Sequence, residues 1–156
     1  MSASAEVATK ATSTDTAAAV RALRGAASHV ERTIARALEP FGLTTAQFST
    51  LQVLLAAETE SLGCSEIAQR LGGPGPDVTR LIDRLEAAGL VSRDRSQIDR
   101  RLVHARITVA GRKAVDDAAP SVNQAEEQAM SSLAATERLA LARLLASVQK
   151  SCPGHG

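Results

Sequence analysis

The stretch CSEIAQRLGGPGPDVTRLIDRLEAAGLVSR, residues 64–93, contains two helix-like segments separated by a run of Gly and Pro. The first segment, CSEIAQRLGG, predicts a short helix that ends at a pair of glycines. The second, DVTRLIDRLEAAG, has apolar residues at helical spacing and Gly89 just beyond its end, where helices commonly stop. Two helices joined by a tight turn predict a helix-turn-helix, whose second helix fits the major groove of DNA.

After the second helix the pattern changes from helical to strand-like. LVSR (90–93) and LVHARIT (102–108) flank a charged stretch, and together they predict an antiparallel hairpin. Seven of the eighteen Lys and Arg residues fall between Arg93 and Lys113, although the formal net charge of the chain is only +1. A hairpin with a cationic tip can extend an arginine into the minor groove, whose negative potential attracts guanidinium. The sequence therefore predicts a winged helix-turn-helix.

The segments on either side of this unit predict amphipathic helices, so the fold is mainly α with a small β-hairpin. Residues 15–38 carry apolar side chains every three or four positions, and the sequence EPFG at 39–42 breaks that helix. TTAQ at 44–47 matches a capping box that opens the next helix. Helix is predicted again from about 109 to 130 and over TERLALARLLASVQK (136–150).

The composition indicates one globular domain with tails. The chain has 156 residues, 44% of them hydrophobic, and its core must be aliphatic because it has only two Phe and no Trp or Tyr. No apolar run approaches the roughly 20 residues that a membrane span requires. Residues 1–14 are polar and lack the apolar centre of a secretory signal. We therefore expect a disordered tail at 1–14, a loose tail at 151–156, and a cytoplasmic protein.

Motifs for catalysis are missing from the sequence. It contains no GxGxxG, GxSxG or HExxH motif and no paired carboxylates in an apolar segment, so we expect no enzyme and no cofactor. The three histidines form no cluster at zinc-ligand spacing, so we also expect no metal site. Cys64 and Cys152 predict free thiols, and Cys64 directly precedes a helix, a position at which thiols can be reactive.

Three segments together resemble the MarR family of winged-helix transcription regulators. They are LTTAQFSTLQVL (43–54), VTRLIDRLEAAGLV (78–91) and DRRLVHARIT (99–108), and the resemblance extends over about residues 15–150. It implies a cytoplasmic homodimeric repressor that binds pseudo-palindromic double-stranded DNA and is released by a small-molecule effector.

The resemblance also divides the chain by role. It implies that residues 15–40 and 109–150 form dimerisation helices and that residues 44–108 form the DNA-binding lobe. Arg24, Ser28 and His29 are expected to edge an effector crevice between these parts, with ordinary exposed side chains as the alternative.

DNA contacts are expected at the supporting helix, the recognition helix and the wing. Arg101 matches the wing-tip arginine, Asp99 matches the aspartate that positions it, and Asp77 departs from the usual hydroxyl residue. The Asp77 carboxylate suits the helix dipole and can accept from cytosine, so operator preference does not transfer from relatives. The expected contact residues are Ser65, Gly75, Pro76, Asp77, Thr79, Arg80, Arg84, Asp99, Arg100 and Arg101.

Two alternatives remain open from the sequence. One is a redox- or zinc-responsive regulator of the same fold, which would use Cys64 or the histidines. The other is a winged-helix dimerisation or adaptor module that does not bind DNA. Salt dependence separates the adaptor from a DNA binder, because neutralising phosphates releases counterions and makes the affinity fall steeply with salt.

Overall fold

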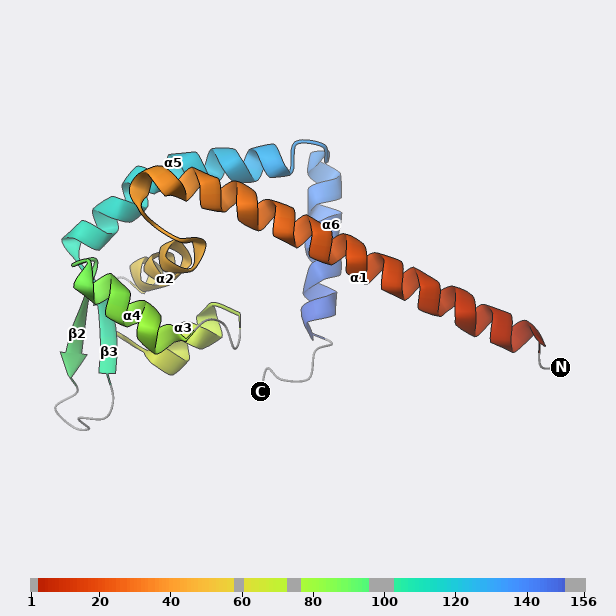
Figure 1. The fold of residues 1–156 in the computed structure, drawn as a ribbon, viewed down its shortest axis with the longest axis horizontal. Helices are drawn as coiled ribbons and strands as arrows, with labels where there is room; N and C mark the ends of the chain where they lie inside the picture. Colours follow the sequence, from red (N-terminus) through yellow and green to blue (C-terminus); the bar gives the residue numbers. More distant parts are fainter. Residues whose placement is uncertain (1–2, 58–60, 73–76, 96–102, 151–156) are drawn as a thin grey trace.

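The computed structural model of the chain describes residues 3–57, 61–72, 77–95 and 103–150, with side chains from residue 15 onward except at 94, 95 and 103. Over these residues the elements are α1 (Ala3–Leu38), the 3-10 turn η1 (Glu39–Phe41), α2 (Thr45–Ala56), β1 (Leu62–Gly63), α3 (Cys64–Arg70), α4 (Val78–Ala87), β2 (Val91–Arg95), β3 (Val103–Ile107), α5 (Val109–Ala129) and α6 (Ala135–Lys150). Figure 1 shows α2, α3, α4 and the strands gathered in one lobe, with α5 and the end of α1 along its upper side.

The lobe has the predicted winged helix-turn-helix arrangement. β2 and β3 pair antiparallel, with Val91 opposite Ile107 and Arg95 opposite Val103, which confirms the hairpin. The sheet has a third strand that the sequence analysis missed, because β1 pairs with β3 through only two residues and gives the order β1-β3-β2. Two residues are too few to show the alternating pattern by which a strand is recognised in a sequence.

One core, aliphatic apart from Phe48, joins the helices of the lobe to the sheet and to α5. Ala105 and Ile107 of β3 are buried and Arg106 is exposed, as the predicted alternation requires. The other members of this core come from all the α-helices except α6, from β1 and β2, and from the segment before α2: Leu38, Leu43, Phe48, Leu51, Leu54, Leu62, Ile67, Val78, Leu81, Ile82, Leu85, Val91, Val115, Ala118 and Val122. The packing therefore holds α4, the hairpin and the start of α5 as one unit.

Local signals set the boundary between α1 and α2 where the sequence predicts it. Gly42 has φ = 66°, a left-handed conformation that glycine adopts without a Cβ clash, and it closes the break after α1. Thr44 and Gln47 then form both hydrogen bonds of the capping box, at 3.2 and 2.9 Å, and α2 begins at Thr45.

Thr108 connects the end of α4 to the beginning of α5, and we call its contacts with Gly89, Leu90 and Gly111 the Thr108 junction. The Thr108 hydroxyl donates to the Gly89 carbonyl at 2.8 Å and accepts from the Gly111 N–H at 3.0 Å. The Thr108 N–H donates to the Leu90 carbonyl at 3.1 Å. One residue thus caps α5 and holds the turn that follows α4.

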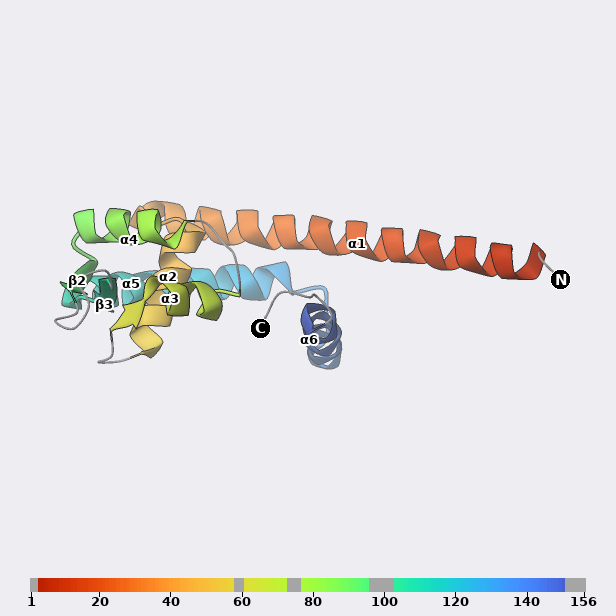
Figure 2. The same cartoon turned by 90° about the horizontal axis from the view of Figure 1, so that it is seen from below.

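The first helix corrects one expectation. α1 begins at Ala3, so residues 3–14, for which the sequence predicted a disordered tail, continue the helix. Ala contributes four of those residues, and Ala has the highest helix propensity, which outweighs the polar composition. Figures 1 and 2 show this part of α1 extending away from the lobe as a long arm.

The last helix lies apart from the lobe (Figure 2) and has no buried residue. Its large apolar side chains are largely open to solvent, with exposed fractions of 60% for Leu139, 66% for Leu144 and 52% for Val148. On α1, Val20 and Leu23 are also exposed. Among the described residues, no helix is long and apolar enough to cross a membrane.

Candidate nucleic-acid interface

α4 is strongly amphipathic. Its buried residues face the core, and they are Val78, Leu81, Ile82 and Leu85. Its other face carries the exposed side chains of Thr79, Arg80, Asp83, Arg84 and Glu86. The core packing of one face fixes how the helix presents the other, which is the requirement for a helix that enters a DNA groove.

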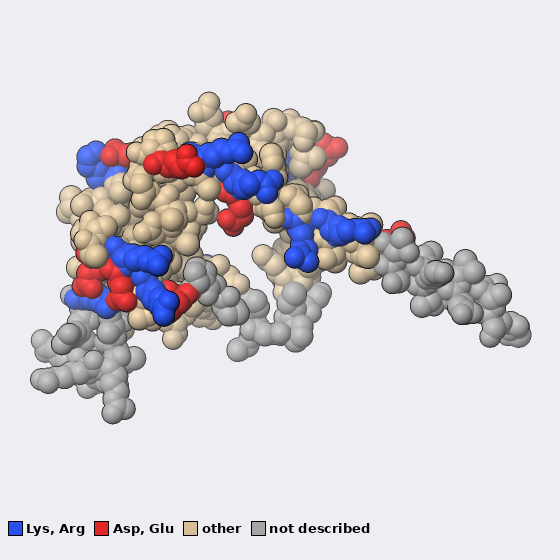
Figure 3. All heavy atoms as spheres, in the orientation of Figure 1, with Lys and Arg blue, Asp and Glu red and all other residues tan. Residues whose placement is uncertain are grey.

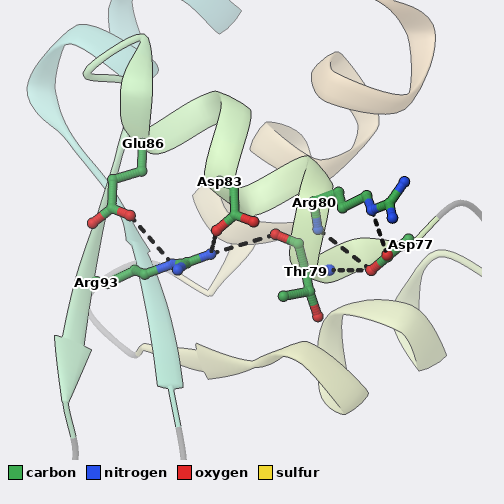
Figure 4. Close-up of polar contacts among 6 residues, drawn as sticks. All are labelled: Asp77, Thr79, Arg80, Asp83, Glu86 and Arg93. Carbon is green, nitrogen blue, oxygen red and sulfur yellow. Dashed lines mark hydrogen bonds and ion pairs between the residues drawn. The ribbon is translucent and has the colours of Figure 1, made fainter.

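Asp77 organises the N-terminal end of α4. Its Oδ1 accepts from the backbone N–H groups of Thr79 at 3.1 Å and Arg80 at 3.4 Å, so the carboxylate is the helix N-cap. Its Oδ2 lies 3.3 Å from Arg80 Nε in an ion pair whose side chains are 56% and 80% exposed. Figure 4 shows the three residues together at this end of the helix. Asp77 therefore stabilises the helix start, as its fit to the helix dipole indicated, and orients Arg80.

The predicted contact residues fall into three groups. Asp77, Thr79 and Arg80 lie together at the start of α4, and exposed Arg84 is one turn further along. Exposed Ser65 is the second residue of α3, which packs against α4. Gly75, Pro76, Asp99, Arg100 and Arg101 lie outside the described residues, so what the sequence predicts for them stays a prediction.

Arg93 is a residue of this surface that the sequence analysis missed. It lies on β2, and its guanidinium forms an ion pair with Asp83 and another with Glu86, both on α4. Figure 4 shows its side chain reaching from the strand to the helix. The sequence contains a partial signal, because Asp83 and Glu86 are three positions apart and so share a helix face. Only the tertiary fold shows that Arg93 is their partner.

Positive charge is present on α4 and on α1. Figure 3 shows Lys and Arg side chains over α4 and, on the same face, along α1, with acidic side chains beside those of α4. The cations of α4 are Arg80 and Arg84, and among those of α1 are Arg32 and Arg36. A mixed surface of this kind lets a few exposed arginines meet phosphates while the nearby acids limit nonspecific attraction.

A groove of about 530 Å³ lies between α1 and α5. His29, Thr33 and Arg36 line it from α1, and Gln124 and Gln128 line it from α5. Of the three residues predicted to edge an effector crevice, only His29 is in this lining, whereas Arg24 and Ser28 are exposed elsewhere on α1. The lining mixes polar and apolar side chains, and its one arginine suits a small anionic molecule.

Residues for metal or thiol chemistry are scattered in the described part of the chain. In residues 3–57, 61–72, 77–95 and 103–150, no three His, Cys, Asp or Glu side chains come close enough to hold a metal ion. Cys64 is a free, half-buried thiol at the first position of α3. The zinc-responsive alternative therefore gains no site from these described residues, and the redox-responsive one would depend on Cys64 alone.

Comparison with known proteins finds relatives that regulate transcription or bind DNA. A model of the MarR family matches residues 41–102. The transcriptional repressor MprA of Escherichia coli is 31% identical over 101 residues, which are 65% of this chain, and the chain spans only 57% of MprA. Bordetella bronchiseptica BpsR, whose structure concerns regulation of its DNA binding by 6-hydroxynicotinic acid, is 25% identical with a TM-score of 0.75, and the match covers 83% of this chain and 97% of BpsR.

The strongest evidence on family comes from a match that spans almost a whole relative. The crystal structure of a MarR transcription factor from Planctomyces limnophilus is 35% identical to this chain, with a TM-score of 0.68. The match covers 83% of this chain and 94% of that one, so it extends beyond the lobe into the flanking helices. With the lobe, the capped α4 and the hairpin in the arrangement described above, this chain belongs to the MarR family of transcription regulators.

Proposed function

We propose that this protein is a homodimeric transcriptional repressor that binds double-stranded operator DNA through α4 and the β2–β3 wing. The observation that carries the proposal is α4, which buries one face in the core and exposes Arg80 and Arg84 beside a capped N-terminus. A helix held in this way can place arginine forks against guanine edges in the major groove. The names of MprA, a transcriptional repressor, and of BpsR, whose DNA binding is regulated, support it. The proposed repressor acts by binding alone, without catalysing a reaction, and it is located in the cytoplasm.

The dimer follows from the exposed apolar side chains of α1 and α6. Leu144 and Val148 share one face of α6 and each expose more than half of their surface, and burying apolar surface contributes about 25 cal/mol per Å². A second copy can cover this face through a two-fold axis. Two recognition helices related by such an axis meet two half-sites in opposite directions, so the operator is pseudo-palindromic.

Salt titration of DNA affinity tests the proposal. Operator fragments are selected from a random duplex pool, and affinity is measured by fluorescence anisotropy at several salt concentrations on selected and scrambled duplexes. We expect tighter binding to the selected duplex and a steep fall of log affinity with log salt concentration. Binding that is absent, or that does not change with salt, would support the adaptor alternative.

Arg80 and Arg101 are expected to contribute differently. Arg80→Ala should lower discrimination among operator variants, because a base-edge contact is worth about 1–3 kcal/mol. Arg101→Ala should weaken binding to specific and unrelated duplexes alike and reduce the salt slope by about one, because a minor-groove arginine contributes mainly charge. Asp99→Ala should act like Arg101→Ala but more weakly. An unchanged affinity and salt slope in Arg101→Ala would contradict a DNA-reading wing.

We propose that a small anionic molecule releases the repressor from DNA by binding at the α1–α5 groove. Arg36 and His29 supply donors on the α1 side, and Gln124 and Gln128 supply amides on the α5 side. The regulation of BpsR by an aromatic acid supports this class of effector. The test is a screen of aromatic and aliphatic carboxylic acids for release of labelled operator, repeated on Arg36→Ala. An acid that releases wild type and Arg36→Ala equally binds elsewhere.

A further inference from the structure

Arg93 contacts three residues of α4 through two of its guanidinium nitrogens. Its Nη2 donates to the Thr79 carbonyl at 3.4 Å and also pairs with Asp83 Oδ1. Its Nε, which is buried, lies 3.3 Å from Glu86 Oε2, within ion-pair distance without the alignment of a hydrogen bond. The Arg93 side chain is 23% exposed, less than either carboxylate partner. The guanidinium therefore faces the helix and is turned away from solvent (Figure 4).

The three points of contact lie along one face of the recognition helix. Thr79 is in its first turn and Glu86 is in its last, and the spacings of four and three residues place all three partners on the same side. At 1.5 Å per residue, the seven residues from Thr79 to Glu86 span roughly 10 Å. A contact at one point would leave α4 free to tilt about it, whereas contacts in the first and last turns oppose both tilting and rotation about the helix axis.

The charges around Arg93 direct it to the helix and away from DNA. Two carboxylates face one guanidinium, so a phosphate would have to displace both ion pairs before it could contact Arg93. Arg93 in turn neutralises part of the acidic charge that Asp83 and Glu86 bring to a DNA-facing helix. Its planar fork suits this arrangement, because it can bind a carbonyl and a carboxylate with fixed geometry.

We propose that Arg93 is a positioning residue that fixes the orientation of α4 relative to the wing and thereby sets sequence discrimination, without itself contacting DNA. The inference rests on the proposed DNA-binding function. α4 reads the major groove and the wing reaches the minor groove, so both can engage only at one relative orientation. Arg93 belongs to the wing strand and holds the helix, so it is the side chain that links the two.

The test compares Arg93→Gln with wild type on selected and scrambled duplexes. The discrimination ratio, operator affinity divided by scrambled-DNA affinity, should fall by about tenfold, the loss expected when one base-reading side chain is misplaced. The salt slope should stay at the wild-type value. A slope that falls by about one unit with an unchanged ratio would show that Arg93 is a phosphate contact and would overturn the proposal. Arg106→Gln removes the same charge from the neighbouring strand and should leave the ratio unchanged.

The carboxylate partners give an independent test. Asp83→Asn should lower the discrimination ratio in the same way, and Asp83→Asn combined with Arg93→Gln should lower it no further than either change alone, because the two residues act as a pair. If Arg93 were instead a phosphate contact that Asp83 restrains, Asp83→Asn would raise affinity on both duplexes and keep the ratio. Normalising to active protein separates the ratio from stability, since unfolding lowers the active fraction and leaves the ratio alone.

The controls also separate this inference from the proposed function. Absence of salt-dependent DNA binding by wild type would refute the proposed function before any variant is measured. Wild-type binding with an unchanged ratio in Arg93→Gln and Asp83→Asn would refute only the positioning role. If Arg93→Gln does not fold, the same ratio is measured on Asp83→Asn and Glu86→Gln, where a lower ratio supports the role and an unchanged one overturns it.

Discussion

Gly111→Ala is expected to destabilise the protein by about 3 kcal/mol or more, at or above the upper end of the range for overpacked sites. A Cβ at Gly111 would lie 2.1 Å from the Leu90 carbonyl oxygen and 2.8 Å from Ile107 Cγ1. The Leu90 oxygen is a backbone atom that already accepts from Thr108, so it cannot rotate away as a side chain would. Relieving the clash requires moving the start of α5 away from the hairpin. Urea unfolding followed by circular dichroism measures the loss.

Gly63→Ala is the matched control for this prediction. Gly63 has φ = −71°, which alanine adopts easily, and a Cβ there would meet only Glu66 Oε2, at 3.4 Å. The free energy of unfolding should fall by only about 1 kcal/mol, the typical loss when alanine replaces a favoured residue at a helix N-cap. Equal stability losses in the two variants would contradict the steric explanation for Gly111.

Leu144→Glu combined with Val148→Glu is expected to convert the dimer into monomers and to lower operator affinity by about 100-fold or more. Both side chains lie on one face of α6 with more than half of their surface exposed, so two buried carboxylates would replace apolar contacts in the dimer. Separate protomers lose the gain that comes from binding two linked half-sites, which typically amounts to about 10²–10⁴. Sedimentation velocity gives the oligomeric state, and anisotropy gives the affinity.

The control replaces an exposed apolar residue that lies outside the face of α6 with Leu144 and Val148. Val109 is 85% exposed at the first position of α5, where an acidic residue is favoured by the helix dipole. Val109→Glu should therefore remain dimeric and fully folded. A monomeric wild type, or a dimer that survives the double substitution in α6, would contradict assembly through this face.

The features predicted from the sequence are those that depend on neighbouring residues. The Thr44–Gln47 capping box, the break that Gly42 closes and the alternation in β3 each depend on a few consecutive positions, and the structure has all three. The helix begins earlier than its polar N-terminal composition predicts, because the helix propensity of the alanines at 3–14 outweighs that composition.

The features that the sequence did not reveal depend on contacts between distant segments. β1 is a strand only because β3 lies beside it. Arg93 looked like one more cation of the wing, and only the packing of β2 against α4 brings it to Asp83 and Glu86. The two ion pairs of Arg93 join residues ten and seven positions apart across the turn that follows α4. No local spacing rule predicts which cation pairs with which acid.

The Thr108 junction couples the orientation of the recognition helix, α4, to that of α5. A single hydroxyl holds the turn after α4 and caps α5, and the bare Cα of Gly111 lets the two backbones touch without a side chain between them. Because these few direct contacts leave little freedom for the two helices to move separately, a change in the direction of α5 turns α4 with it. A signal that enters at the far end of α5 can therefore change the separation of the two recognition helices by rigid rotation, while the lobe itself stays folded.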